Sequence, residues 1–110
     1  MIRYDAIEAA MYEAMRLAAT RIPPDVEAAL QKARAEETNP LAVEHLDVSL
    51  ENFRLAAEGN GLVCGDTGYP LYFVTAGNNT QIQGGFGRLW DAARTATARL
   101  TDESYLRPTM

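Results

Sequence analysis

The periodicity of the apolar residues changes near Leu71, and this change constrains the fold more than any other feature of the sequence. Before that point, apolar side chains recur at the three- and four-residue spacing that places them on one face of a helix. At Leu71-Tyr72-Phe73-Val74 they become continuous, aromatic and β-branched, which is typical of a strand. The sequence therefore predicts a single mostly helical α+β domain over residues 1–110, with about four helices and one short strand or hairpin.

Three amphipathic helices are expected in the first half of the chain. The first covers about residues 3–20 and ends before Pro23-Pro24, because a proline disfavours helical conformation at the residue before it. A second helix begins near Asp25, whose charge suits the positive end of the helix dipole. Its expected buried residues are Val26, Ala29, Leu30 and Ala33. Thr38-Asn39-Pro40 predicts the start of a third helix over about residues 41–58.

The second half is predicted to combine the strand at 71–74 with one more helix. Residues 77–80 are rich in turn formers, so the chain is expected to return through 81–83 as a hairpin. Gly84-Gly85-Phe86-Gly87 is interpreted as a flexible connector, because it matches neither the Rossmann nor the Walker pattern of a phosphate-binding loop. A fourth helix follows, marked by Leu89, Ala93, Ala96 and Leu100, and the tail from Thr101 is expected to be extended.

Composition argues against a nucleic-acid-binding, membrane-spanning or disulfide-rich protein. A net charge of −5, with no run of basic residues, argues against nucleic acid as a partner. No apolar stretch approaches the roughly 20 residues that a membrane span requires, and the first residues do not resemble a secretory signal. One cysteine excludes an internal disulfide framework. The simplest interpretation is a cytoplasmic protein.

The segment before the predicted strand concentrates the chemically reactive residues. It offers a thiol, a carboxylate and a hydroxyl from one glycine-bracketed turn, in the order Cys64-Gly65-Asp66-Thr67-Gly68. Each has a structural alternative: Cys64 as a buried inert thiol, Asp66 as a turn residue and Thr67 as a capping hydroxyl. His45, the one histidine, is assigned no role.

This segment resembles the Cys-Gln-Asp-Thr-Gly signature of the class I fumarase and L-tartrate dehydratase alpha-subunit family, which are iron–sulfur hydro-lyases. Phe73-Val74-Thr75-Ala76-Gly77 is similar to the strand that follows the signature, and Asn52 matches a common helix asparagine. Ile22-Pro23-Pro24-Asp25-Val26 and Leu106-Arg107-Pro108 resemble two further family segments. Gly65 stands where the family has Gln. The family's alpha chains are much longer and contain two further cysteines, so residues 1–110 resemble only the N-terminal portion of such a subunit.

The resemblance implies a component of a hydro-lyase acting on a small hydroxy-carboxylic acid. It implies catalytic roles for Asp66 and Thr67, substrate contacts from Gly65 and Arg107, and metal ligation by Cys64. A 4Fe–4S cluster is expected only if other chains supply the remaining thiolates, because such a cluster requires three or four. The expected partners are further copies of the chain or a larger subunit.

Two other functions remain open from the residues alone. One is a cluster-free enzyme that acts by itself, with Cys64 or Asp66 as the catalytic group. The other is a non-catalytic assembly module for a larger subunit. Both are compatible with a small domain whose apolar positions exceed what a core of this size can bury.

Overall fold

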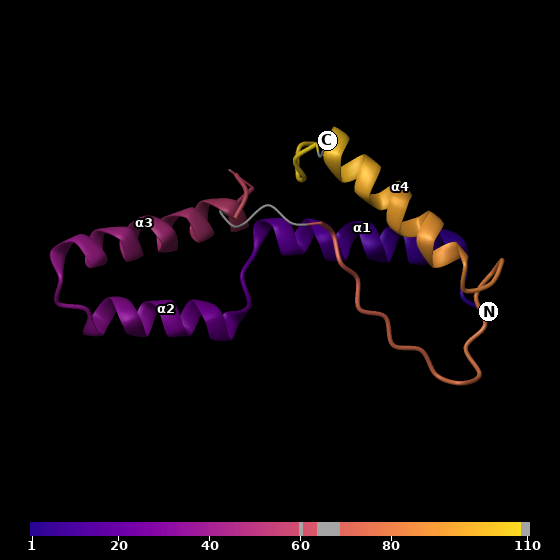
Figure 1. The fold of residues 1–110 in the computed structure, drawn as a ribbon, viewed down its shortest axis with the longest axis horizontal. Helices are drawn as coiled ribbons and strands as arrows, with labels where there is room; N and C mark the ends of the chain where they lie inside the picture. The colour runs from indigo at the N-terminus through magenta and orange to yellow at the C-terminus, as the bar shows by residue number, and fades with distance from the viewer. Residues whose placement is uncertain (60, 64–68, 109–110) are drawn as a thin grey trace. The chain divides into compact units, whose positions relative to one another are not determined.

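The computed structural model describes residues 1–59, 61–63 and 69–108, and within these ranges the chain is predominantly helical (Figure 1). Four helices follow one another along the chain: α1 (Tyr4–Thr20), α2 (Pro24–Glu36), α3 (Pro40–Ala57) and α4 (Arg88–Asp102). The predicted bounds of the first and third helices agree with α1 and α3 to within one residue at each end. No helix in the described ranges is both long and apolar enough to cross a bilayer.

The starts of α2 and α3 follow directly from local sequence. Each begins with a proline at its first position, Pro24 and Pro40, where the missing N–H is not needed by the helix. Asn39 caps α3, because its side-chain oxygen accepts hydrogen bonds from the backbone N–H groups of Leu41 (3.0 Å) and Ala42 (3.4 Å). These two prolines and one cap confirm the predicted breaks between the helices.

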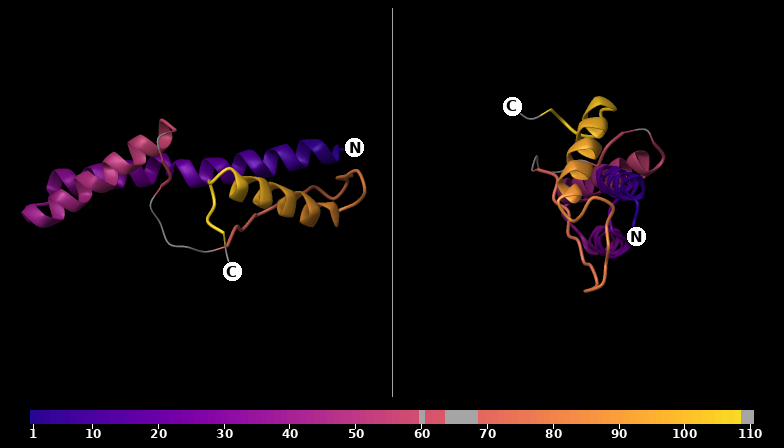
Figure 2. Two further views of the ribbon diagram at one scale, coloured as in Figure 1. Left: turned by 90° about the horizontal axis from the view of Figure 1, so that it is seen from above. Right: turned by 90° about the vertical axis from the view of Figure 1, so that its right-hand side faces the viewer.

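The chain divides into two compact units. The first combines Met1–Leu17 with Thr67–Met110, and the second is Ala18–Asp66. In the first unit, α4 runs beside the N-terminal part of α1, as both the front view and the view from above show (Figures 1 and 2). Met11 of α1 packs there with Ala92 and Ala96 of α4, and Leu100 is fully buried. Small residues on α4 thus make room for a long one on α1.

The second unit is a helical hairpin with a thin core. α2 and α3 lie against each other, and Arg34 Nε pairs with Asp47 Oδ1 across them at 2.5 Å. Among the described residues of this unit only Thr20 and Ala56 are buried. The predicted burial of Val26, Ala29 and Ala33 is wrong, because each is exposed on α2. One neighbouring helix covers only part of the apolar stripe that the sequence pattern defines.

The predicted strand or hairpin is not seen in the described residues. Residues 71–74 form neither strand nor helix, and Ile82 of the expected return strand pairs instead with Ile2 in an isolated parallel bridge. In that bridge the N–H of Ile2 donates to Gln81 O (2.8 Å) and the N–H of Gln83 donates to Ile2 O (2.9 Å). The hairpin prediction is wrong because the bridge partner of Ile82 in the described residues is Ile2, at the N-terminus, and not the segment 71–74.

The connections on either side of α4 are defined turns. Gly84 and Gly85 both have positive φ, 82° and 85°, and an added Cβ at Gly84 would lie 2.8 Å from Arg88 Cγ. At the other end, α4 closes with Ser104 in the left-handed conformation (φ 67°). Two backbone hydrogen bonds, Ser104 N to Thr101 O and Tyr105 N to Leu100 O, complete a Schellman motif. The expectation of an extended tail from Thr101 is therefore wrong for its first residues.

Candidate functional site

The four motif residues that the sequence nominates, Cys64, Gly65, Asp66 and Thr67, lie outside the described residues. The structure describes the chain on either side of them, together with Arg107. The approach to the motif belongs to the second unit and its exit to the first. Each side is therefore considered within its own unit.

Two hydrogen bonds hold the approach to the motif. The side-chain amide of Asn52, on α3, donates to the carbonyl of Leu62 at 3.0 Å. The N–H of Val63 donates to the carbonyl of Ala19 at 2.9 Å. Gly59, with a φ of 85°, turns the chain out of α3 and makes this course possible. The residue directly before Cys64 is thus fixed to α1 within the second unit.

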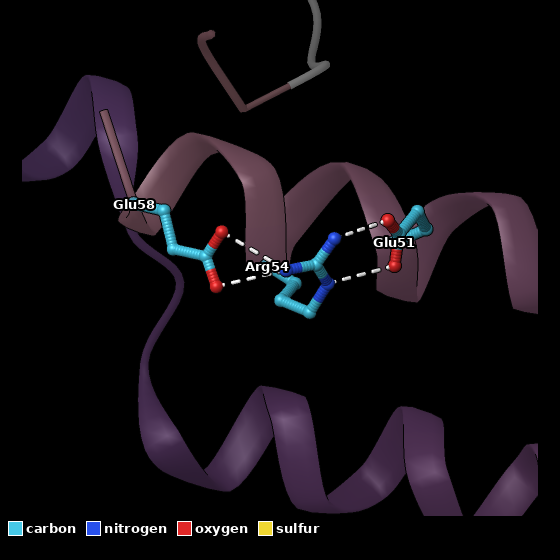
Figure 3. Close-up of polar contacts among 3 residues, drawn as sticks. All are labelled: Glu51, Arg54 and Glu58. Carbon is cyan, nitrogen blue, oxygen red and sulfur yellow. Dashed lines mark hydrogen bonds and ion pairs between the residues drawn. The ribbon is translucent and has the colours of Figure 1, made fainter. Parts of the chain in front are cut away.

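The end of α3 is braced by one arginine between two glutamates (Figure 3). Arg54 donates through Nε and Nη2 to Glu51 at 2.9 and 2.5 Å, and through Nη1 to both oxygens of Glu58 at 2.8 and 2.9 Å. The Arg54 guanidinium lowers the pKa of Glu51. All three side chains are about half exposed, so each pair contributes little by itself. Together they favour helix up to the turn that precedes the motif.

The exit from the motif is held by Tyr72. Its hydroxyl donates to the carbonyl of Met11 at 3.2 Å, and its ring packs against the cluster of Met11, Ala92 and Ala96. Burial is the main cause that raises the pKa of Tyr72. The neighbouring side chains of Leu71 and Phe73 are exposed. One aromatic residue thus fixes the extended segment to the first unit.

A polar cluster joins α1 to the end of α4. The Tyr12 hydroxyl donates to Glu103 Oε2, Arg99 Nε donates to Glu103 Oε1 at 3.0 Å, and the Arg99 guanidinium lies 4.0 Å from the centre of the Tyr12 ring. The hydrogen bond from Tyr12 lowers the pKa of Glu103, and the same bond raises the pKa of Tyr12. This cluster fixes the turn that leads to Arg107, which is exposed.

An open groove of about 570 Å³ lies along α3, away from the motif in sequence. Its lining combines apolar residues such as Val43 and Val48 with the carboxylates of Glu44, Asp47 and Glu51. Asp47 and Glu51 are paired with Arg34 and Arg54, and the lining itself contains carboxylates but no Lys or Arg, so this groove offers no cation to a hydroxy-dicarboxylic acid. It is an amphipathic helix surface.

The residues of this chain do not supply enough ligands for a complete iron–sulfur site. Within residues 1–59, 61–63 and 69–108, no group of three or more His, Cys, Asp or Glu side chains is arranged to hold a metal ion. Cys64 supplies one thiolate, fewer than the three or four that a 4Fe–4S cluster takes. Any such site would need ligands from elsewhere.

Sequence reasoning missed the supporting roles of Asn52 and Tyr72. The sequence marks Asn52 only by its resemblance to the family, although a polar residue on a partly buried helix face is a signal for a specific hydrogen bond. The apolar run at 71–74 predicts a strand position for Tyr72, yet a tyrosine in such a run needs a partner for its hydroxyl when it packs inward.

Comparison with known proteins agrees with the motif. A sequence model of the fumarate hydratase (Fumerase) family matches residues 8–110. Over 96 residues the chain is 30% identical to a Methanocaldococcus jannaschii protein named "Putative L(+)-tartrate dehydratase subunit alpha". The aligned region covers 87% of this chain and 33% of that protein, so this chain spans about a third of its relative's length. No solved structure matches the chain significantly. The resemblance to the family is thereby confirmed: the chain belongs to the fumarate hydratase (Fumerase) family of class I fumarases and tartrate dehydratase alpha subunits.

Proposed function

We propose that this chain is a component of a hydro-lyase that adds water to, or removes it from, a small hydroxy-carboxylic acid. The observation that carries the proposal is the family match over residues 8–110, which includes the Cys-Gly-Asp-Thr-Gly segment at 64–68. Two hydrogen bonds support it, each within its own unit: Val63 is bonded to Ala19 before the segment, and Tyr72 is bonded to Met11 after it. The remaining catalytic part would come from the length of the family that this chain does not span.

In this proposal each motif residue has a separate task. Asp66 is the group that accepts a proton from the substrate carbon in dehydration and returns it in hydration. The Thr67 hydroxyl and the backbone at Gly65 contact the substrate's oxygen atoms. Arg107 binds a substrate carboxylate, for which its planar guanidinium offers two parallel N–H donors. Cys64 would hold one iron of an iron–sulfur cluster whose other thiolates would belong to another part of the enzyme, and the cluster would supply the Lewis acid that takes the departing hydroxyl.

A second candidate function is an assembly module without catalytic residues. Exposed apolar side chains on the helical hairpin favour it, since Val26, Leu41 and Val48 remain uncovered there. Exposed Leu71 and Phe73 favour it in the first unit. Both functions require a partner, and they differ in whether the partner's activity depends on Cys64 and Asp66.

The deciding experiment reconstitutes the chain, without oxygen, with a polypeptide that carries the rest of a fumarate hydratase alpha subunit. Hydration of fumarate and dehydration of malate and tartrate are then measured for the parent chain, Cys64→Ala and Asp66→Asn. The proposed function predicts turnover and bound iron for the parent, with both variants inactive. Full activity of both variants would support the assembly module, and activity of the chain alone, without iron, would support a cluster-free enzyme.

A further inference from the structure

The segment after the motif has the features of an unpaired β-strand. Residues 69–76 form neither helix nor turn, and exposure alternates along the first five of them: Tyr69, Leu71 and Phe73 are 83%, 69% and 90% exposed, whereas Pro70 and Tyr72 are partly covered; Val74, the next residue, is 55% exposed. This alternation is the two-residue period of a strand with one packed face and one open face. The covered face is the one that Tyr72 presents to Met11.

The main-chain N–H and C=O groups of this segment lack main-chain partners among the described residues. Between residues 69 and 76, no main-chain N–H or C=O is bonded to the main chain of another described residue. The nearest bridge joins Ile2 to Ile82, so these two residues are already paired with each other. A non-helical segment with open N–H and C=O groups is suited to pairing with a β-strand, since the backbone groups of a helix are already bonded to one another.

The sequence lacks the usual protection of an exposed strand edge. Proteins that keep such an edge in water place charges on it, above all lysine, or cover it. Here none of the residues from 67 to 87 is charged. An uncharged segment that exposes two large apolar side chains, Leu71 and Phe73, favours burial against an apolar partner surface.

We infer that residues 69–75 are a docking strand, and that its occupant is a β-strand with an apolar face from the two thirds of the family's length that this chain does not span. The aligned region covers only 33% of the M. jannaschii relative, so a large part of the relative's body is available to cover the edge. A second copy of the chain is less suitable, because two chains of net charge −5 repel each other. The inference deepens the proposed function, on which it rests for the existence of a further catalytic part.

Hydrogen–deuterium exchange tests the pairing directly. The two samples are this chain alone and a covalent fusion of this chain to the two thirds of the M. jannaschii protein that the alignment leaves out. Amides within 71–75 are expected to exchange at least about tenfold more slowly in the fusion, because ladder bonds must open before exchange. The intact M. jannaschii protein, measured at its own matching segment, is expected to show the same protection.

Matched substitutions separate strand pairing from general adhesion. Phe73→Lys should remove the protection in the fusion, because it places a charge on the docking face. Phe86→Lys makes the same change at another exposed aromatic residue, outside the strand, and should leave the protection intact.

Several results would overturn the inference. These are unchanged exchange at 71–75 in the fusion, an unprotected matching segment in the intact relative, or equal effects of the two lysine variants. Protection in the chain alone that rises with its concentration would identify a second copy as the occupant instead. Hydro-lyase activity is measured on the same samples. Protection without turnover would contradict the proposed function alone, and turnover without protection would contradict the docking strand alone.

Discussion

The side-chain amide of Asn52 donates a 3.0 Å hydrogen bond to the carbonyl of Leu62, so α3 holds the chain two residues before Cys64. Asn52 lies in the second-last turn of the helix, and Arg54 braces the last turn through Glu51 and Glu58. The position of the motif's approach is therefore determined by a helix side chain as well as by backbone contacts.

Replacing Asn52 with alanine should destabilise this approach. We expect Asn52→Ala to lower the free energy of unfolding by about 1 kcal/mol, the usual loss for one such hydrogen bond. Urea unfolding followed by circular dichroism measures it. Asn79→Ala, in the exposed turn at 77–80, is the control and should change stability by less than about 0.5 kcal/mol. Equal effects at both positions would show that the bond to Leu62 does not hold the segment.

Among the described residues, Ser104 is the one non-glycine residue with a positive φ. Its φ of 67° places a Cβ in the left-handed region at the end of α4, where glycine is the preferred residue. Ser104→Gly should raise the free energy of unfolding by roughly 0.5–1 kcal/mol, since relief of this strain exceeds the entropy that glycine adds to the unfolded chain. Ala98→Gly, inside the same helix, should lower it by about 1 kcal/mol. Thermal unfolding measures both variants. Melting temperatures that shift in the same direction would contradict the strain assigned to Ser104.

Leu100 is the largest fully buried side chain in the described residues and should be the most costly to shorten. Leu100→Ala is expected to lower the free energy of unfolding by roughly 2–5 kcal/mol, because it loses apolar burial and leaves a cavity. Leu71→Ala makes the same change at an exposed position of the same unit and should be nearly neutral in the isolated chain. A small loss at Leu100 would mean that the end of α4 is not packed as described.

The cluster of Tyr12, Arg99 and Glu103 gives stability a defined dependence on acid. The hydrogen bond from Tyr12 lowers the pKa of Glu103 in the folded chain, so the unfolded chain binds a proton there more readily. This contribution is therefore complete above the ordinary glutamate pKa of about 4.3 and is lost as the pH falls through the lowered value. Tyr12→Phe should raise the pKa of Glu103 and reduce this acid resistance. An NMR titration of the Glu103 carboxyl carbon measures it, with Tyr69→Phe as the control.

Asp66→Asn tests the proposed catalytic carboxylate while preserving its shape. In the reconstituted enzyme the substitution should reduce kcat by roughly 100-fold or more, the usual contribution of a positioned acid–base group. Its melting temperature should remain close to that of the parent. A variant that unfolds would identify Asp66 as a structural turn residue, and one that keeps full activity would remove Asp66 from the mechanism.

Local signals in the sequence were sufficient to predict the bounds of the helices. They were not sufficient to predict which helix faces are buried or which segments pair. Prolines at 24 and 40 and the cap at Asn39 act within a few residues, so the bounds of α1 and α3 could be predicted closely. Val26 and Ala33 were predicted to be buried because an apolar stripe indicates which face is covered, but it does not show how many neighbours cover it. The pairing of Ile82 with Ile2 joins opposite ends of the chain, and no local pattern specifies such a partner. The motif could be recognised by resemblance, whereas the bonds from Asn52 and Tyr72 depend on tertiary contacts.

The division of the first unit into Met1–Leu17 and Thr67–Met110 affects the order in which the protein can form during translation. Met11 leaves the ribosome long before Ala92 and Ala96, the residues against which it packs. The α2–α3 hairpin, whose contacts are local, can form in the interval. The apolar face of the nascent N-terminal helix must therefore wait for α4, and throughout that interval it is a potential binding site for chaperones.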